Sequence, residues 1–250
     1  MYIVDDGIRL NAILDRPANS PEKQPLLVII HGFTGHVMER HILAFAETAN
    51  DLGIATLRVD MYGHGSSDGK FEDHTLYKWL TNALTVIDYA RSLPFVSDLY
   101  IGGHSQGGLT TMLVGAMKQD VLAGILPLSP AWMIPEQARE GVLLGQPFDP
   151  DHIPDILGVW NDRTLKGNYA RVAQMIHVEE AIERFRKPVL LVHGDADADV
   201  PYAYGVKAAQ MYADCEFVTI PGDTHCYDYH LEMVTDAVRK WFLEHAVTGR

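Results

Sequence analysis

Residues 99–113 read Leu-Tyr-Ile-Gly-Gly-His-Ser-Gln-Gly-Gly-Leu-Thr-Thr-Met-Leu and contain the pattern Gly-x-Ser-x-Gly around Ser105. Average residue usage produces this pattern in about one chain in ten of this length, so the flanking residues decide its meaning. An apolar run predicts a strand before the pattern, and a helical repeat predicts a helix after it. A sharp turn between them requires glycine, because neighbouring backbone comes too close for side chains. The turn would raise the Ser105 hydroxyl above a sheet edge, at a helix N-terminus that favours negative charge.

The same alternation of short apolar runs and longer amphipathic stretches extends along the chain. The runs that predict strands cover residues 9–14, 26–30, 54–59, 99–102, 122–128, 189–192 and 217–220. The stretches that predict helices cover residues 39–52, 75–93, 106–119, 202–213 and 230–245. Strands buried on both faces and joined by helices form a mostly parallel sheet with helices on both sides. Residues 1–14 break at Asp5-Asp6-Gly7 without a helix, which predicts an antiparallel hairpin at one edge.

One interval, residues 131–186, departs from this alternation. It holds four of the 13 prolines and two of the four tryptophans. A structureless loop of that length is improbable inside a compact domain, so an inserted lid with its own small structure is expected after the sixth strand. Turn residues between short apolar pieces favour hairpins over residues 156–169. We therefore predict one domain over residues 1–250, carrying an inserted lid at residues 131–186.

Charge and composition exclude several classes of partner. The chain has 20 lysines and arginines against 33 aspartates and glutamates, a net charge of −13, and no basic cluster. Nucleic acid and anionic membranes are therefore poor partners. Neither a signal peptide nor a run of about 18 apolar residues is found, which predicts a cytoplasmic protein. The two cysteines, Cys215 and Cys226, lack CxxC spacing and are expected to be reduced thiols.

A serine nucleophile needs a base and hydrogen-bond donors for its oxyanion. Among twelve histidines, His225 stands in a loop directly after the last predicted strand and is the best candidate base. His31 and His193 each end a strand before a glycine and remain candidates for lining the site. In this architecture the oxyanion donors are the backbone N–H groups of Gln106, after the serine, and of Phe33, after an earlier strand.

The segment His-Gly-Asp-Ala-Asp-Ala-Asp-Val-Pro, residues 193–201, places three aspartates at alternate positions after an apolar run. A calcium loop of the EF-hand type starting at Asp195 would need glycine at its sixth position and glutamate at its twelfth. Those positions are Val200 and Val206, and no HExxH motif occurs in the chain. No metal site is therefore predicted.

The remaining roles for these aspartates are structural or catalytic. A solvated turn accounts for Asp195, and Asp199 could cap a helix that opens at Val200-Pro201. Spacing alone does not select the aspartate that assists the histidine.

Five motifs stand in a characteristic order along the chain. They are His31-Gly-Phe33, Asp60-Met-Tyr-Gly-His-Gly-Ser-Ser-Asp68, Gly103-His-Ser-Gln-Gly107, the segment 193–201 and Gly222-Asp-Thr-His225. This set resembles the α/β-hydrolase superfamily over residues 8–245. The size, the serine motif and the insert after the sixth strand are similar to those of the bacterial cinnamoyl (feruloyl) esterases. Those enzymes release hydroxycinnamic acids from esters of plant cell-wall sugars or quinate.

The resemblance selects the acid of a catalytic triad. In the family the acid stands three residues after a glycine and three before Val-Pro, a register that Asp197 fits. The order Ser105, Asp197, His225 is also that of the superfamily. Asp223 is a poorer candidate because it shares the tight loop of the histidine.

The implied function is that of a serine carboxylic-ester hydrolase, without a cofactor, that releases ferulate, caffeate or p-coumarate through an acyl-enzyme. The expected partner is a small-molecule ester, and monomer and homodimer both stay open. An aromatic acyl group requires an apolar slot with a polar group at its end. Candidate walls in the insert are Trp132, Phe148, Trp160 and Tyr169, and candidate partners for a phenolic hydroxyl are Gln146 and Tyr169. Trp132 and Phe148 could instead pack the lid onto the body.

Several rival functions share these residues. A generic short-chain carboxylesterase, a monoacylglycerol lipase or a thioesterase would keep the triad and differ in the lid. A haloalkane dehalogenase would need aspartate at position 105, where this chain has serine. A hydrolase-fold protein that only binds small molecules is the alternative outside enzymes.

Overall fold

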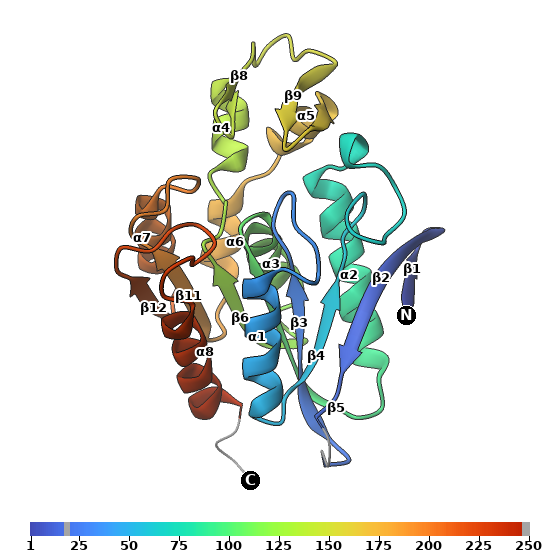
Figure 1. Ribbon diagram of the computed structural model, residues 1–250, viewed down its shortest axis with the longest axis vertical. Helices are drawn as coiled ribbons and strands as arrows, with labels where there is room; N and C mark the ends of the chain where they lie inside the picture. The colour runs from blue at the N-terminus through green and yellow to red at the C-terminus, as the bar shows by residue number, and fades with distance from the viewer. Residues whose placement is uncertain (18–20, 247–250) are drawn as a thin grey trace.

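A computed structural model describes residues 1–17 and 21–246 and contains an eight-stranded sheet (Figure 1). The strands lie in the order β1-β2-β4-β3-β5-β6-β11-β12. Their bounds are β1 Tyr2–Asp5, β2 Ile8–Asp15, β3 Gln24–Ile30, β4 Ala55–Val59, β5 Val96–His104, β6 Leu122–Leu128, β11 Val189–Gly194 and β12 Cys215–Ile220. The pairs β1/β2 and β2/β4 are antiparallel, and the other neighbouring pairs are parallel. The predicted mostly parallel sheet with an antiparallel hairpin at one edge is confirmed.

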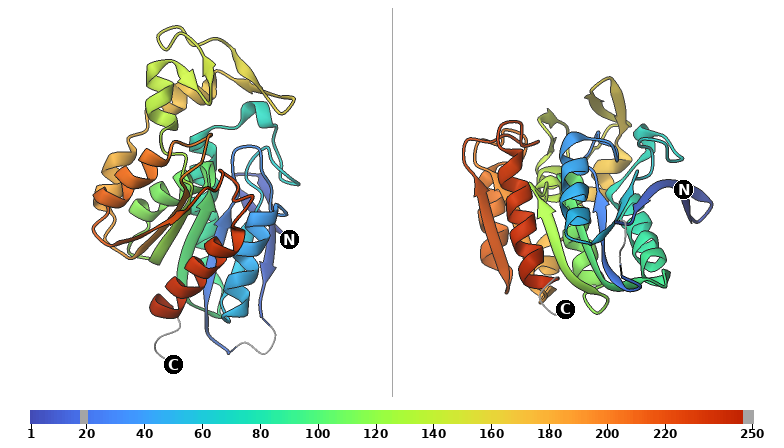
Figure 2. Two further views of the ribbon diagram at one scale, coloured as in Figure 1. Left: turned by 60° about the vertical axis from the view of Figure 1, so that its left-hand side comes forward. Right: turned by 60° about the horizontal axis from the view of Figure 1, so that its bottom comes forward.

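Helices cover both faces of the sheet. The bounds of the main ones are α1 Arg40–Asp51, α2 Leu76–Ser92, α3 Gln106–Met117, α7 Tyr202–Met211 and α8 Leu231–His245. In β3, Leu27 and Ile29 pack with side chains of α1 and α8, which lie side by side on one face (Figure 2). Leu26 and Val28 face the opposite way, toward α2 and α3. A strand buried on both faces has no polar side, which explains the unbroken apolar run at this position.

The insert after β6 lies above the carboxyl ends of the strands and has its own secondary structure (Figure 1). Its elements are α4 Ile134–Glu140, β7 Val142–Leu143, β8 Gln146–Pro147, β9 Ile156–Trp160, β10 Arg163–Lys166, α5 Asn168–Ala173 and α6 Val178–Arg184. The hairpin predicted from turn residues is β9/β10. Its two-residue loop, Asn161-Asp162, has φ of +48° and +61°, as the right-handed twist of a tight hairpin requires.

Polar contacts join this hairpin to the body below it. Lys166 Nζ lies 2.8 Å from the carboxylate of Asp73, which belongs to the 3-10 turn η1 (Phe71–Asp73). Arg163 Nη1 donates to the carbonyl oxygen of Thr34, in the loop after β3, at 3.1 Å. The hairpin thus lies directly on the loop that the sequence predicts to hold an oxyanion.

None of the helices in residues 1–17 and 21–246 is both long enough and apolar enough to span a membrane.

Candidate active site

Ser105 stands on a strained turn between β5 and α3. Its φ is +58° and its ψ is −119°, a conformation that residues with a side chain rarely adopt. A Cβ at Gly103 would come within 2.6 Å of the backbone of Gly107, and one at Gly107 within 2.3 Å of the carbonyl oxygen of Ile30. Both glycines are therefore needed for β5 to turn into α3 beside β3. The predicted strand, turn and helix around Ser105 are confirmed.

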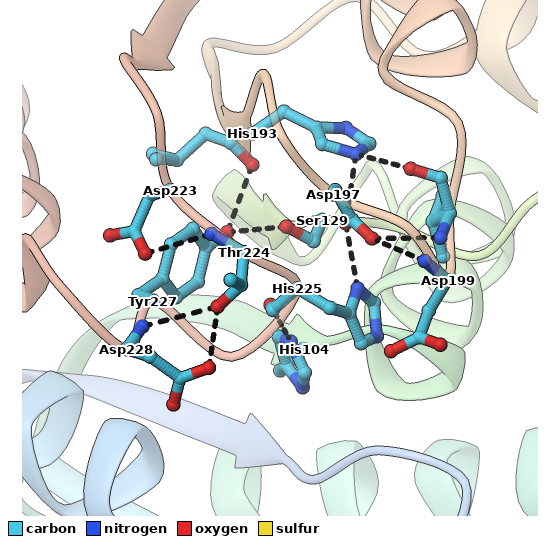
Figure 3. A network of polar contacts seen from close by, with 12 residues as sticks. His104, Ser129, His193, Asp197, Asp199, Asp223, Thr224, His225, Tyr227 and Asp228 are labelled. Carbon is cyan, nitrogen blue, oxygen red and sulfur yellow. Dashed lines mark hydrogen bonds and ion pairs between the residues drawn. The ribbon is translucent and has the colours of Figure 1, made fainter.

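Asp197 and His225 form a hydrogen-bonded pair beside this turn (Figure 3). His225 Nδ1 lies 2.7 Å from Asp197 Oδ2, and the Asp197 side chain is fully buried. Its Oδ1 accepts from the backbone N–H groups of Asp199 and Val200 at 2.9 and 2.8 Å. Burial opposes ionisation of the carboxyl, but the hydrogen bonds from His193 and His225 outweigh it and hold the pKa of Asp197 below its usual range. The Asp197 side chain is therefore an anion that orients one imidazole nitrogen.

The other carboxylates of these loops have different surroundings. Asp195 is exposed, and its Oδ1 accepts from the N–H of Gly222 at 2.6 Å. Asp223 is buried and accepts from the backbone N–H groups of three residues of its own loop. Both carboxylates hold loop backbone.

The prediction that Asp199 caps a helix is wrong. Helix α7 begins at Tyr202, and the residue at its N-cap is Pro201, without a side-chain cap. Val200 and Pro201 continue the loop instead of opening the helix, so Asp199 stands too far from the first turn. Its side chain lies at the surface and lines a cavity.

Asp197, Asp199 and His225 are also residue types that bind metals, with ligand atoms within 4.8 Å of one another. In Asp197, however, both oxygens already accept hydrogen bonds, one of them from His225 Nδ1. The arrangement fits an Asp–His pair better than a cation site.

Ser105 and His225 line one cavity of about 630 Å³, within the usual size of small-molecule sites. Phe33, from the loop after β3, and Trp160, from the β9/β10 hairpin, lie in its wall. Their rings meet edge to face with centroids 5.7 Å apart. The cavity thus combines the predicted nucleophile and base with an aromatic wall made by body and insert together.

Of the insert residues that were predicted to bind substrate, some line the cavity and others do not. Trp160 lines the cavity, whereas Tyr169 is fully buried outside the lining, and its hydroxyl donates to Gln106 Oε1 at 2.6 Å. Gln146 is exposed on β8 and does not line the cavity. Trp132 is buried and donates to the carbonyl oxygen of Tyr204, which agrees with the packing alternative.

Sequence reasoning missed other residues that line the cavity. Gln137 and Ile134 lie three residues apart on α4, and both face the cavity. That spacing on one helix face was the available signal. Asn161, at the tip of the hairpin, and Glu39, before α1, also line the cavity. No local pattern marks these two, since they approach the site only through tertiary packing.

Buried histidines surround the loop after β3. The two ring nitrogens of His64 face the carbonyl oxygens of Phe33 and Tyr62. His31, considered above as a site liner, is instead fully buried, and its Nε2 accepts from the N–H of Met61 at 3.0 Å. Burial lowers the pKa of His31 and His64, and it lowers that of His74 to about 3. These buried rings pack against one another and against Phe33 beside the loop.

The sheet order and the strained serine define the class of protein. A model of the family described as serine aminopeptidase S33 matches residues 21–166, more than half of the chain, and a model described as TAP-like protein matches residues 165–248. The chain therefore belongs to the serine aminopeptidase S33 family and has the α/β-hydrolase fold.

Solved structures give a more specific comparison than the family models. Est1E from Butyrivibrio proteoclasticus with ferulic acid bound is 62% identical, with a TM-score of 0.97 and coverage of 98% of both chains. Another Est1E structure is 59% identical, with a TM-score of 0.93 and the same coverage. The matches confirm the predicted fold, and the ferulic acid bound to Est1E agrees with the predicted resemblance to cinnamoyl esterases.

Curated relatives are more distant and longer. The palmitoyl-protein thioesterase ABHD10 of Pongo abelii is 30% identical over 195 residues, which cover 75% of this chain and 61% of that protein. The human protein ABHD12B is 25% identical over 193 residues, which cover 75% of this chain and 49% of that protein. The chain thus spans roughly half to three fifths of the length of these relatives.

Proposed function

We propose that this protein is a serine carboxylic-ester hydrolase that releases hydroxycinnamic acids from their esters. The observation that carries the proposal is the bond from His225 Nδ1 to the buried Asp197 carboxylate, in a loop whose histidine shares a cavity with Ser105. The ferulic acid bound to Est1E supports an aromatic acyl group.

The proposed reaction passes through an acyl-enzyme. Because Nδ1 of His225 is bonded to Asp197, its Nε2 is the nitrogen left to act as base. His225 takes the hydroxyl proton as Ser105 Oγ attacks the ester carbonyl, and then gives it to the departing alcohol. Water attacks the acyl-serine by the same proton transfers, and the free acid leaves.

The oxyanion of each tetrahedral intermediate accepts from the backbone N–H groups of Phe33 and Gln106 in this proposal. Gln106 opens α3, where unpaired N–H groups favour negative charge. The Phe33 loop is held by His64, which contacts the carbonyl oxygen of Phe33, and by Arg163, which donates to that of Thr34. Donors fixed before the reaction need no reorganisation when charge develops.

The acyl group is assigned to the part of the cavity under the insert. Phe33 and Trp160 supply aromatic walls, and Ile134 and Leu144 supply aliphatic ones. Gln137 lies at this end, and its Oε1 accepts from the N–H of Leu144, which leaves the amide nitrogen for a phenolic oxygen. In this proposal residues 131–186 act as a lid over one domain.

A panel of esters tests the assignment. We expect kcat/KM for ethyl ferulate and methyl caffeate to exceed that for ethyl acetate and ethyl butyrate by at least about tenfold, since burying an aromatic ring in a fitted slot contributes more than burying a short chain. A palmitoyl thioester in the same panel covers the activity named for ABHD10. Faster turnover of simple acyl esters or of the thioester would contradict the proposal.

A further inference from the structure

The Asp197 carboxylate has a partner that the proposed mechanism does not use. His193 Nε2 lies 3.2 Å from Asp197 Oδ2, the same oxygen that accepts from His225 (Figure 3). Both side chains are fully buried. With two backbone N–H groups on Oδ1, the carboxylate accepts from four groups, which fills its acceptor positions.

The geometry also determines which nitrogen of His193 carries a proton. Nε2 lies 3.1 Å from the carbonyl oxygen of Val200 as well as 3.2 Å from Asp197 Oδ2. Both partners can only accept, so Nε2 must be the donor. Nδ1 is buried without a hydrogen-bond partner in the described part of the chain, as suits an unprotonated nitrogen.

A glycine inside the neighbouring helix α7 provides the space for the His193 ring. A Cβ at Gly205, inside α7, would come within 2.5 Å of His193 Nδ1. Glycine destabilises a helix interior, yet here it admits the imidazole. Tyr202, on the same helix, packs edge-on against the ring with centroids 5.8 Å apart. The ring is thus held from the helix side as well as from the carboxylate side.

We propose that His193 is a positioning residue for the reaction, which fixes the Asp197 carboxylate so that Oδ2 points at His225 Nδ1 and shares part of its negative charge. The inference rests on the proposed function, which assigns Asp197 and His225 to one catalytic triad. Without the His193 donor, Oδ2 would rotate more freely and concentrate its charge on His225. The negative charge facing His225 would then be greater and would favour the protonated ring over the free base that takes the serine proton.

The test compares pH profiles of kcat/KM for ethyl ferulate in four variants. His193→Phe keeps a ring and removes the donor, and His193→Gln keeps an N–H near the Nε2 position. Gly205→Ala displaces the ring without changing it, which serves if the phenylalanine variant does not fold. Tyr202→Phe is the control, because it keeps the ring that packs against His193 and removes only a hydroxyl that contacts Thr219. All four variants keep the other titratable groups around Asp197 and His225. These groups are His41, His104, Asp199, Cys226 and Tyr227.

We expect His193→Phe and Gly205→Ala to move the acid-side midpoint to higher pH, and His193→Phe to lower kcat about tenfold, the effect of one lost hydrogen bond. His193→Gln should restore most of kcat, and Tyr202→Phe should keep the wild-type midpoint. A wild-type midpoint in His193→Phe or Gly205→Ala, or a glutamine variant no better than phenylalanine, overturns the inference. If the wild-type protein neither cleaves ethyl ferulate nor labels at Ser105 with a fluorophosphonate, the proposed function itself fails.

Discussion

Asp197 differs from its two neighbouring aspartates in surroundings alone. Asp195 and Asp199 are exposed, whereas the Asp197 side chain is buried and receives four hydrogen bonds. An anion without water needs such donors, since the desolvation penalty of a bare carboxylate is several kcal/mol. The resemblance selects Asp197 as the triad acid, and the burial and hydrogen bonds of its side chain support that proposal.

Removal of single triad groups tests the assignment. We expect Ser105→Ala or His225→Ala to lower kcat by around 10⁶, and Asp197→Asn by about 10⁴, without unfolding, as in measured triads. Asp195→Asn is the matched control, because asparagine keeps an acceptor for the N–H of Gly222. Full activity in Asp197→Asn together with loss in Asp195→Asn or Asp199→Asn would reverse the assignment.

Tyr169 is now expected to support the serine turn instead of binding a phenol. In Tyr169→Phe the buried Gln106 Oε1 loses its donor, which costs about 1–3 kcal/mol. We expect a lower midpoint of thermal unfolding and an unchanged ratio of kcat/KM for ferulate and cinnamate esters. Tyr77→Phe, at an exposed tyrosine, is the control. If the ratio of kcat/KM for ferulate and cinnamate esters falls toward one in Tyr169→Phe, Tyr169 binds the phenolic hydroxyl and the expectation is wrong.

The β9/β10 hairpin is the element that joins the insert to the site. Trp160 lies in the cavity wall, whereas Val159, the residue before it, is exposed. The ends of the hairpin contact Thr34 and Asp73 of the body. The aromatic part of the cavity wall therefore depends on an element whose position is set by contacts outside itself.

Truncation of one side chain measures this dependence. We expect Trp160→Ala to raise KM for ethyl ferulate about tenfold or more and to change KM for ethyl acetate much less, because only the aromatic acyl group uses that wall. Val159→Ala on the same hairpin should leave both unchanged. Equal effects of Trp160→Ala on the two esters would remove Trp160 from the acyl slot.

Five of the six buried histidines in the described residues link the stability of the whole molecule to pH. They are His31, His41, His64, His74 and His104. Burial lowers the pKa of all five, to about 4 for His41 and about 3 for His74. In the unfolded chain they titrate at about pH 6.5. Below that pH the unfolded state binds protons that the folded state refuses, so stability is present above about 6.5 and is lost as pH falls.

Thermal unfolding at pH 7.5, 6.5 and 5.5 tests this linkage. Each such histidine contributes a slope of up to about 1.4 kcal/mol per pH unit, so we expect a steep fall in the unfolding midpoint between pH 6.5 and 5.5. His41→Leu should reduce the slope by one histidine's share, whereas His152→Leu, at an exposed histidine, should not. A midpoint independent of pH over this range would contradict the expectation.

Local sequence patterns predicted much of the fold and placed several residues of the candidate site. The apolar runs matched strands within a few residues, because side-chain periodicity depends on neighbours along the chain. The turn at Ser105 was predictable because Gly103 and Gly107 meet a steric demand within five residues. The cavity wall was predicted only in part, since Trp160 faces the cavity but Gln146 does not.

The chain itself specified the order of strands and helices, the strained serine and the loop that carries His225. Only tertiary structure decided that Tyr169 meets Gln106, 63 residues away, and that His193 shares the Asp197 carboxylate with His225. Such contacts depend on how separate elements pack in three dimensions, and no periodicity along the chain records that packing.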